Sequence, residues 1–525
     1  MTSAPPGHAQ VLATVARGGA VNFVGTVVAA VSGLGLVLVV TRLVERHTAG
    51  QFFAATAAYL VLVAIASLGT DAGLGRLLPR VDPSRRSFEI RQLVRAALVP
   101  VLLLSVLIAA AVVIMAPALT RWLGLDDPQA VTAVRVLGLS VPAFVIGDVF
   151  LAVTRALGVM RTTVVIDRFF RVCCQVTLVV VAVVAGVGLG WLTSAWVAPY
   201  LGSALLAWYA ARAQLRRIVD DVPETEPPRR RRTLRQVRRE FWGFTWARSV
   251  AKVSQMVIQR ADIVIIGVLL GPSEAAIYTA ATRFVPLGQF ATQAIQLSAQ
   301  PRFSMLLARG QLDTLRELYR TTTTWSMALA WPLYLVVGAA PFVYLWLFGS
   351  EYAAGASVCT VMAAGMLVGA ATGPVDTMLL MAGRSTKSLI NSLIALAIDL
   401  ALCVVLVPRL GIIGAALAWS LAVSVRALMA TWQVHRELGL RAFGRPAAMV
   451  AGLAVLCFAV PFATLSVTEV RHPGAVIGVG ALTVFGYAAG LWALRRPLRL
   501  EAFRGFLRNR RRPDVEVSQS PEGGA

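Results

Sequence analysis

Charged side chains lie inside long apolar stretches of this 525-residue chain, and their types and spacing could do chemistry. Asp262 lies eight residues before the end of one such stretch, and Arg283 lies eight residues after the next one begins. At 1.5 Å per helical residue, both would sit about 12 Å below the same membrane surface, where they could meet. Charge is costly inside a bilayer, so it marks either a buried ion pair or the path of a transported substrate.

Polar residues repeat with helical spacing on the same two stretches. At 100° per residue, an arc of about 80° on the first stretch holds Arg248, Lys252, Gln255, Gln259 and Asp262. An arc of about 100° on the second holds Thr279, Thr282, Gln289, Gln293, Gln296 and Gln300, with Arg283 just beyond its edge. Polar rows of this kind would find no hydrogen-bond partners against lipid. We therefore expect Arg283 and Lys252 to line a cationic cavity that carboxylates tune, with a purely structural Asp262–Arg283 pair as the alternative.

The expected cavity defines a set of candidate substrate-binding residues. They are Arg283, Lys252, Asp262, Gln255, Gln259, Gln293 and Arg426, the last of which is embedded in a later apolar stretch. Other charges inside or beside apolar stretches are Asp148, Arg155, Asp167, Arg168 and Asp399. Each of these alone is more often a contact that holds helices together than a ligand site.

The sequence lacks the motifs of several chemistries. The nearest fragment to a nucleotide-binding G-x-x-x-x-G-K-[ST] loop is Gly383-Arg-Ser-Thr-Lys387-Ser388, which lacks the glycine before the lysine. No G-x-S-x-G elbow occurs, and no two of the four histidines have the one-turn spacing of a metal site. We therefore expect no catalytic residue, no cofactor, no metal and no enzyme activity.

The composition is that of an integral membrane protein. Hydrophobic residues make up 57% of the chain and charged residues 14%, with a mean hydropathy of +0.72. Soluble domains have roughly 45–50% apolar and about 25% charged residues. The composition excludes a soluble enzyme or a soluble DNA-binding domain, and it predicts an all-α membrane fold.

Fourteen apolar runs are long enough to cross a bilayer, which takes about 20 residues. They cover residues 18–40, 51–71, 93–118, 131–154, 172–189, 191–211, 249–270, 275–300, 321–348, 358–382, 389–408, 411–433, 447–467 and 474–494.

Basic residues alternate between the two sides of these fourteen runs. The two tails and every second connection carry 39 of the 49 Lys and Arg residues, against 5 in the other connections and 5 inside the runs. Cytoplasmic loops accumulate Lys and Arg, so both termini are predicted to be cytoplasmic. The same bias accounts for the net charge of +23 without nucleic acid as a partner.

The chain divides into two halves around a basic segment. We expect a tail (1–17), a six-helix lobe (18–211), a cytoplasmic linker (212–248), a second six-helix lobe (249–433), two further helices (434–494) and a basic, disordered tail (495–525). Residues 43–56 align without gaps to residues 269–282, and both segments join the first and second run of their half. Because each half begins on the same side, the repeat would be parallel, as in transporters built of two lobes.

Two segments resemble a known family. The run from Asp262 to Arg283, DIVIIGVLLGPSEAAIYTAATR, and the run from Pro408 to Ala418, PRLGIIGAALA, are similar to segments of Wzx-type polysaccharide flippases. These belong to the multidrug/oligosaccharidyl-lipid/polysaccharide exporter superfamily. The resemblance extends from about residue 17 to 435 and agrees with fourteen spans, cytoplasmic termini and two lobes.

The resemblance implies a function. Members of that family move polyprenyl-pyrophosphate-linked oligosaccharides from the inner to the outer leaflet of the bacterial cytoplasmic membrane by alternating access, without ATP, for cell-surface polysaccharide biosynthesis. Arg283 and Asp262 match the family's turn, whereas Lys252 and Arg426 are assigned from helical faces. Arginine forks match phosphate oxygens, and glutamines suit sugar hydroxyls. Implied partners are the lipid-linked glycan, anionic membrane lipids, and glycosyltransferases and a polymerase of the same pathway.

Three other functions stay open at this point. A drug or cation antiporter of the same superfamily would hold its cargo with acidic residues, whereas basic residues dominate inside these spans. A membrane glycosyltransferase or polymerase would need acidic residues or a sizeable loop outside. A non-transporting scaffold for cell-wall machinery would keep the fold alone.

Overall fold

The computed structural model describes residues 8–81, 86–220, 233–470 and 472–495, and within these ranges the chain is helical without strands. Eight helices in this described part are long and apolar enough to cross a membrane. The chain is therefore an all-α, multi-pass membrane protein, as its composition predicts. Most of the predicted C-terminal tail and parts of the N-terminal tail and the linker lie outside the described residues.

The first half of the chain forms the N-lobe. Its helices are α1 (His8–Leu43), α2 (Arg46–Ser67), α3 (Thr70–Leu77), η1 (Leu78–Arg80), α4 (Arg86–Trp122), α5 (Ala130–Ala156), α6 (Met160–Thr163), η3 (Val164–Phe170), α7 (Arg171–Val184) and α8 (Leu189–Asp220).

The second half forms the C-lobe and two added spans. The C-lobe holds α9 (Leu234–Leu269), α10 (Pro272–Thr282), α11 (Phe284–Ala308), α12 (Leu312–Ala339), α13 (Pro341–Leu345), η4 (Ser350–Gly355), α14 (Ala356–Ala371), α15 (Val375–Met381), α16 (Ser385–Leu410) and α17 (Ile412–Leu438). After it come α18 (Arg445–Ala454), η5 (Val455–Ala459), α19 (Val460–Val467) and α20 (Pro473–Ala493).

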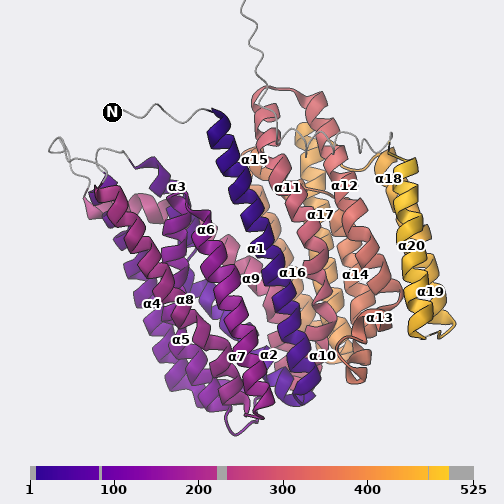
Figure 1. Cartoon of the computed structure of the whole chain (residues 1–525), viewed down its shortest axis with the longest axis horizontal. Coiled ribbons are helices and arrows are strands. Elements are labelled where there is room, and N and C mark those ends of the chain that lie inside the picture. The colour runs from indigo at the N-terminus through magenta and orange to yellow at the C-terminus, as the bar shows by residue number, and fades with distance from the viewer. Residues whose placement is uncertain (1–7, 82–85, 221–232, 471, 496–525) are drawn as a thin grey trace, which may run out of the picture.

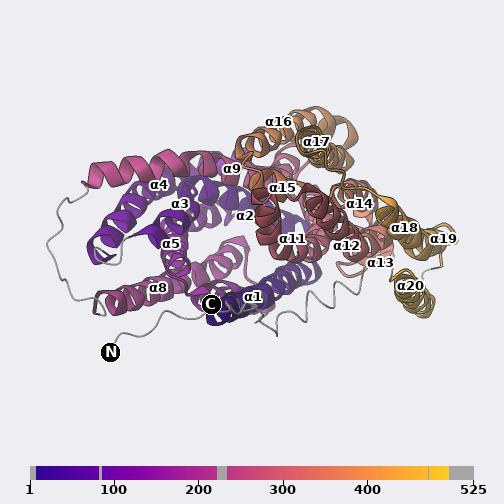
Figure 2. The ribbon, with the colours of Figure 1, turned by 90° about the horizontal axis from the view of Figure 1, so that it is seen from above.

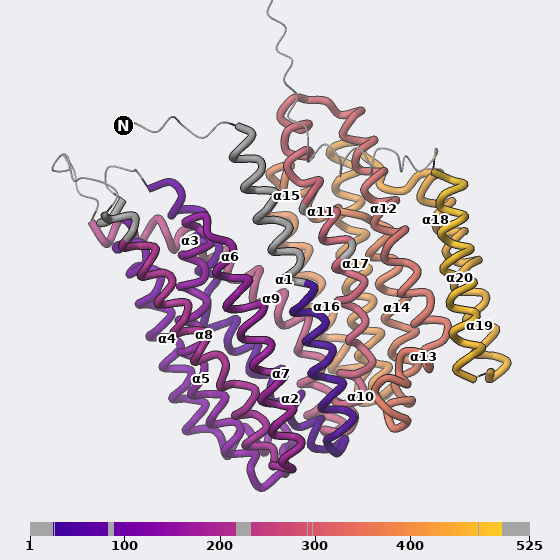
Figure 3. The backbone as a smooth tube through the Cα atoms, in the orientation of Figure 1, coloured from indigo at the N-terminus to yellow at the C-terminus, as the bar shows by residue number. Residues whose placement is uncertain are grey.

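The two lobes stand side by side, with successive helices running up and down through each (Figures 1 and 3). From above, α1 lies along one side of the region between the lobes and α9 along the other (Figure 2). The helices α18 to α20 sit at the far edge of the C-lobe, where α18 and η5 pack on α12.

Each of the fourteen predicted runs overlaps a helix or consecutive helices, but several ends differ. The helices α8 and α9 extend into the predicted linker and leave 221–233 between them. An apolar run marks only the part of a helix that matches the hydrocarbon layer, and Arg, Gln and Glu are good helix formers beyond it. The fifth run was placed too late, because the helical stretch from α6 to α7 starts at Met160 and ends at Val184.

The lobes meet closely at the end of the molecule where α2 and α10 begin. A Cβ added to Gly50 of α2 would lie only 1.7 Å from the carbonyl oxygen of Pro272, so only glycine permits this approach. Nearby, Arg42 at the end of α1 donates from Nε to the carbonyl oxygen of Leu347 at 2.7 Å, and its Nη2 donates to that of Trp346. The two segments of the predicted repeat thus lie at the joint between the lobes.

Helix α9 belongs to both lobes. In its first half, Trp242 donates to the carbonyl oxygen of Ala96 in α4 at 3.1 Å, and Ser249 donates to that of Leu68. Leu68 and Gly69 adopt the left-handed conformation and separate α2 from α3. The hydrogen bond from Ser249 of α9 therefore stabilises this break between the two helices. In its second half, α9 packs on α10, α16 and α17.

The joint at Gly50 gives a stability prediction. Gly50→Ala forces two backbones apart, and overpacking of this kind costs about 1–3 kcal/mol, so we expect a lower Tm in detergent. Gly33→Ala on α1 is the matched control, because a Cβ there meets nothing within 4 Å. Equal thermal unfolding curves for the two variants would contradict the close approach.

Candidate functional site

A polar cavity of about 660 Å³ lies inside the C-lobe, between α9, α11, α12, α14, α16 and α17. Its glutamine wall comes from α9 and α11 and consists of Gln255, Gln259, Gln289, Gln293 and Gln296. Its charged lining residues are Arg260, Asp262, Arg283, Asp376 and Arg426. Six of the seven candidate residues predicted from the sequence therefore surround one cavity, and Lys252 is the exception.

Arg283 enters the cavity from a break between two helices. It is the last residue before α11 and the first after α10, and Pro286 follows three residues later. Proline has no N–H to offer the carbonyl of Thr282 and so favours an interruption here. Side chains satisfy neighbouring carbonyls, since Tyr344 donates to Ala280 at 2.9 Å and Tyr334 donates to Val285 at 3.2 Å.

A second break faces the same cavity. Helix α14 ends at Ala371 and α15 begins at Val375, and Thr372 and Gly373 line the cavity between them. Gly373 has a φ of +64°, and a Cβ there would lie 2.1 Å from the Thr323 hydroxyl. Non-helical backbone at membrane depth is tolerated where it is buried in protein or lines a water-filled cavity. Both breaks are therefore typical of a transporter's binding site.

Asp262 does not pair directly with Arg283. Its carboxylate accepts a hydrogen bond from the Tyr278 hydroxyl at 2.6 Å and one from the backbone N–H of Ile263 at 2.9 Å. No ion pair within 4 Å joins it to Arg283, although it attracts both Arg260 and Arg283 electrostatically. The direct Asp262–Arg283 pair, which the sequence left open as an alternative, is therefore not formed, because depth fixes only the height of a residue and the Tyr278 hydroxyl bonds the carboxylate.

Two of the three cavity arginines keep free guanidinium groups. The Nε atoms of Arg260 and Arg283 are buried without a hydrogen-bond partner, and neither group forms an ion pair with any described residue. Arg426, by contrast, lies 3.8 Å from Asp376 and donates to Gln255 at 3.3 Å. The structure therefore leaves two positive charges beside the glutamines, and no carboxylate in the described part of the chain contacts them.

The sequence analysis missed Arg260 and Asp376. Arg260 lies about 140° around the helix from Gln255, outside the polar arc, and reaches the cavity because an arginine side chain is long. Its position inside an apolar run was the available signal. Asp376 follows the Gly373–Pro374 break, whose cavity-facing position no residue spacing indicates.

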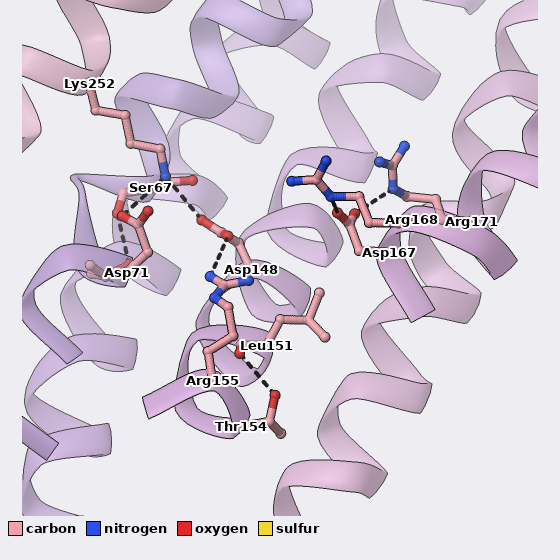
Figure 4. A network of polar contacts seen from close by, with 11 residues as sticks. Ser67, Asp71, Asp148, Leu151, Thr154, Arg155, Asp167, Arg168, Arg171 and Lys252 are labelled. Atoms are coloured by element: carbon pink, nitrogen blue, oxygen red, sulfur yellow. Dashed lines mark hydrogen bonds and ion pairs between the residues drawn. The ribbon is translucent and has the colours of Figure 1, made fainter. Parts of the chain in front are cut away.

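Lys252 lies in a different environment from the one we expected. It contacts Asp71 of α3 at 3.2 Å and Asp148 of α5 at 3.4 Å, and Asp148 lies 3.8 Å from Arg155 (Figure 4). Ten residues separate Lys252 from Asp262, or about 15 Å along a helix. Lys252 thus fixes the middle of α9 to the N-lobe.

Two other predicted charged sites are also accounted for. Arg171 bonds Asp167 at 2.8 Å, and Arg168 lies 3.7 Å from the same carboxylate (Figure 4). Asp399 of α16 is 1% exposed, and its Oδ2 atom has no hydrogen-bond partner. Its Oδ1 atom accepts a hydrogen bond from the Cys403 thiol at 4.0 Å, so Asp399 resembles the cavity arginines only in having one buried polar atom without a partner.

The predicted polar row on α10 and α11 lines the cavity only in part. Thr282, Gln289, Gln293 and Gln296 face it, whereas Thr279 is fully buried elsewhere. Gln300, at the other end of the predicted row, does not line the cavity either. The predicted row assumes one continuous helix, whereas the chain breaks at Arg283.

The arrangement suits the binding of a hydroxyl-rich anion. Free arginines match phosphate oxygens, and amide side chains both donate to and accept from hydroxyl groups. Among the described residues, no three His, Cys, Asp or Glu side chains gather in a way that could hold a metal ion.

Comparison with solved structures agrees with the two-lobe fold. The chain superposes on the lipid II flippase MurJ in an inward closed conformation with a TM-score of 0.69 and 9% identity, covering 90% of this chain and 98% of that one. An inward-facing multidrug resistance transporter of the MATE family, in the same exporter superfamily, superposes with a TM-score of 0.60 and 16% identity. The match covers 78% of this chain and 94% of that one. A transporter of that superfamily from Pyrococcus furiosus superposes with a TM-score of 0.54 and 16% identity, covering 83% of this chain and 99% of that one.

At the level of sequence, no curated protein matches the chain significantly. The pattern that defines the family described as "Polysaccharide biosynthesis protein" matches residues 39–357, from the end of α1 to the start of α14. That match spans more than half of the chain. The chain therefore belongs to this polysaccharide biosynthesis family and has the fold of the multidrug/oligosaccharidyl-lipid/polysaccharide exporter superfamily.

Proposed function

We propose that this protein is a transporter that moves a polyprenyl-pyrophosphate-linked oligosaccharide from the inner to the outer leaflet, by alternating access and without ATP. The observation that carries the proposal is that two arginines without ion-pair partners among the described residues, Arg260 and Arg283, line a cavity rich in glutamines. Family membership and the fold shared with a lipid II flippase support the same class of cargo.

The cavity chemistry fits the three parts of such a cargo. The pyrophosphate carries at least two negative charges, which Arg260 and Arg283 can neutralise through charged hydrogen bonds. Sugar hydroxyls can exchange hydrogen bonds with Gln289, Gln293 and Gln296. The polyprenyl chain would stay in lipid between the lobes while the glycan crosses.

A cation antiporter is the second candidate. The MATE-family transporters share the fold, and Asp262, Asp376 and Asp399 are carboxylates in or near the cavity. Asp262 and Asp376 already contact Tyr278 and Arg426, however, whereas two arginines in the cavity are free. This balance favours an anionic cargo.

The proposed setting is the bacterial cytoplasmic membrane, with fourteen spans and both termini in the cytoplasm. The end of the molecule at which α11 ends and α12 begins would then face the cytoplasm, where lipid-linked glycans are built. Glycosyltransferases and a polymerase of the same pathway would supply and consume the cargo.

The orientation can be tested with single cysteines. Gly186 and Asp127 lie in connections assigned to the outside, and Gly439 and Gly310 in connections assigned to the cytoplasm. We expect a membrane-impermeant thiol reagent to label cysteines at 186 and 127 in intact cells, and those at 439 and 310 only after lysis. The parent must carry the five native cysteines changed to alanine. Labelling at 439 in intact cells would overturn the topology.

The activity itself can be tested in purified form. We expect proteoliposomes without ATP to move a fluorescent polyprenyl-pyrophosphate glycan between leaflets, and depletion in cells to leave the lipid-linked glycan on the inner leaflet. Efflux of organic cations with no glycan movement would favour the antiporter, and strict dependence on ATP would contradict the proposal.

Arg283 separates a binding role from a structural one. Because Asp262 keeps its bonds to Tyr278 and Ile263, we expect Arg283→Ala to leave the Tm close to wild type. Transport should fall at least tenfold, since hydrogen bonds to charged groups are worth about 1.5–3 kcal/mol. Arg283→Lys should restore only part of it, because a point charge replaces a fork.

Two further variants complete that experiment. Arg309→Ala, at the exposed end of α11, is the matched control and should transport normally. The double variant Arg283→Ala with Asp262→Asn should stay folded and inactive. Normal transport by the double variant would mean that Arg283 does not bind cargo.

A further inference from the structure

A second pocket, of about 300 Å³, lies between α16 and α17. These two helices lie along one edge of the C-lobe (Figure 2). Its lining residues are Lys387, Ile390, Trp432, Gln433, Arg436 and Glu437. It shares no lining residue with the polar cavity. It sits where α16 begins and α17 ends, the side of the membrane assigned to the cytoplasm.

Reciprocal amide bonds fix the floor of this pocket. Asn391 of α16 donates to Gln433 of α17 at 2.9 Å, and Gln433 donates back to Asn391 at 2.9 Å. The two helices therefore hold a constant separation here, and the pocket is built into the fold.

The pocket has an excess of positive charge. Lys387 contacts Glu437, and Arg384 lies 3.1 Å from the same carboxylate. The Arg436 guanidinium stacks over the Trp432 ring, 5.3 Å from its centroid, and forms no ion pair with a described residue. Two cations, Lys387 and Arg384, thus share the Glu437 carboxylate, and Arg436 adds a third positive charge that no described carboxylate pairs.

The same pocket also exposes apolar side chains. Trp432 is 58% exposed and Ile390 is 47% exposed, each next to the basic residues on its own helix. A ligand that fills the pocket must therefore meet a positive rim on one side and an apolar surface on the other.

We propose that this pocket binds the headgroup phosphate of an anionic phospholipid from the leaflet on that side of the membrane. Basic pockets between membrane helices on the cytoplasmic side suit such headgroups, and Trp432 with Ile390 would contact the glycerol and upper acyl chain. The Gly383–Ser388 fragment, which fails as a nucleotide loop, thereby supplies Arg384 and Lys387 to a lipid site. The assignment is independent of what the C-lobe cavity carries.

The experiment measures lipid binding by the full chain in a neutral detergent, using native mass spectrometry with phosphatidylglycerol and phosphatidylcholine. We expect phosphatidylglycerol to bind more tightly, and Arg436→Gln to weaken it about fivefold, which equals the roughly 1 kcal/mol per basic residue near an anionic surface. Arg212→Gln is the matched control, because Arg212 makes the same kind of contact with exposed Trp208, at 5.2 Å, on the N-lobe.

A variant expected to strengthen lipid binding distinguishes the loss of a lipid contact from a loss of folding. Glu437→Gln removes the only carboxylate among the described residues that line the pocket, and it should tighten phosphatidylglycerol binding. Equal binding by Arg436→Gln and Arg212→Gln, or equal affinity of wild type for the two lipids, would overturn the proposal. Displacement of the lipid by millimolar inorganic phosphate would also overturn it and assign the pocket to a free anion.

Discussion

Inside a bilayer every backbone polar group must find its partner within the protein, and the C-lobe depends on how it meets this constraint. Two helices are interrupted around the cavity, and tyrosine hydroxyls from α12 and α13 satisfy carbonyls beside the break at Arg283. Tyr319 does the same for the carbonyl of Thr372 at 3.1 Å. Because these acceptors are satisfied, the breaks persist, and Arg283 can project into the cavity rather than along a regular helix.

The lobes treat charge differently. In the N-lobe the clusters around Asp148 and Asp167 consist of cations and carboxylates in contact, so they stabilise helix packing. In the C-lobe cavity Arg260 and Arg283 have no such contacts. Helix α9 contributes to both environments: Lys252 belongs to the N-lobe cluster around Asp148, and Arg260 lines the C-lobe cavity. The same helix therefore holds the N-lobe and presents a free cation to the cavity.

The membrane class, the two lobes and most cavity residues could be predicted because apolar length and helical periodicity are local properties of the sequence. Gln255, Gln259 and Gln293 follow from such periodicity, and they do line the cavity. The partner of Asp262 could not be predicted, since depth alone favours Arg283 over Tyr278, which lies about 7.5 Å nearer the start of the run, and the packing of α10 decides between them. Lys252 was misplaced for a related reason. Helical periodicity shows which residues share a face but not what each part of that face contacts. Helix α9 passes from one lobe to the other along that face.

The contact of Arg42 with the Trp346 and Leu347 carbonyls has a consequence for how the joint between the lobes can vary and move. Both acceptors are main-chain atoms, which exist whatever side chains stand at 346 and 347. Sequence drift at those two positions leaves the acceptors in place, whereas only residue 42 can supply the donor. This contact thus joins one side chain to a peptide backbone, beside the packing of Gly50 against Pro272, and rotation of that single side chain is enough to break it.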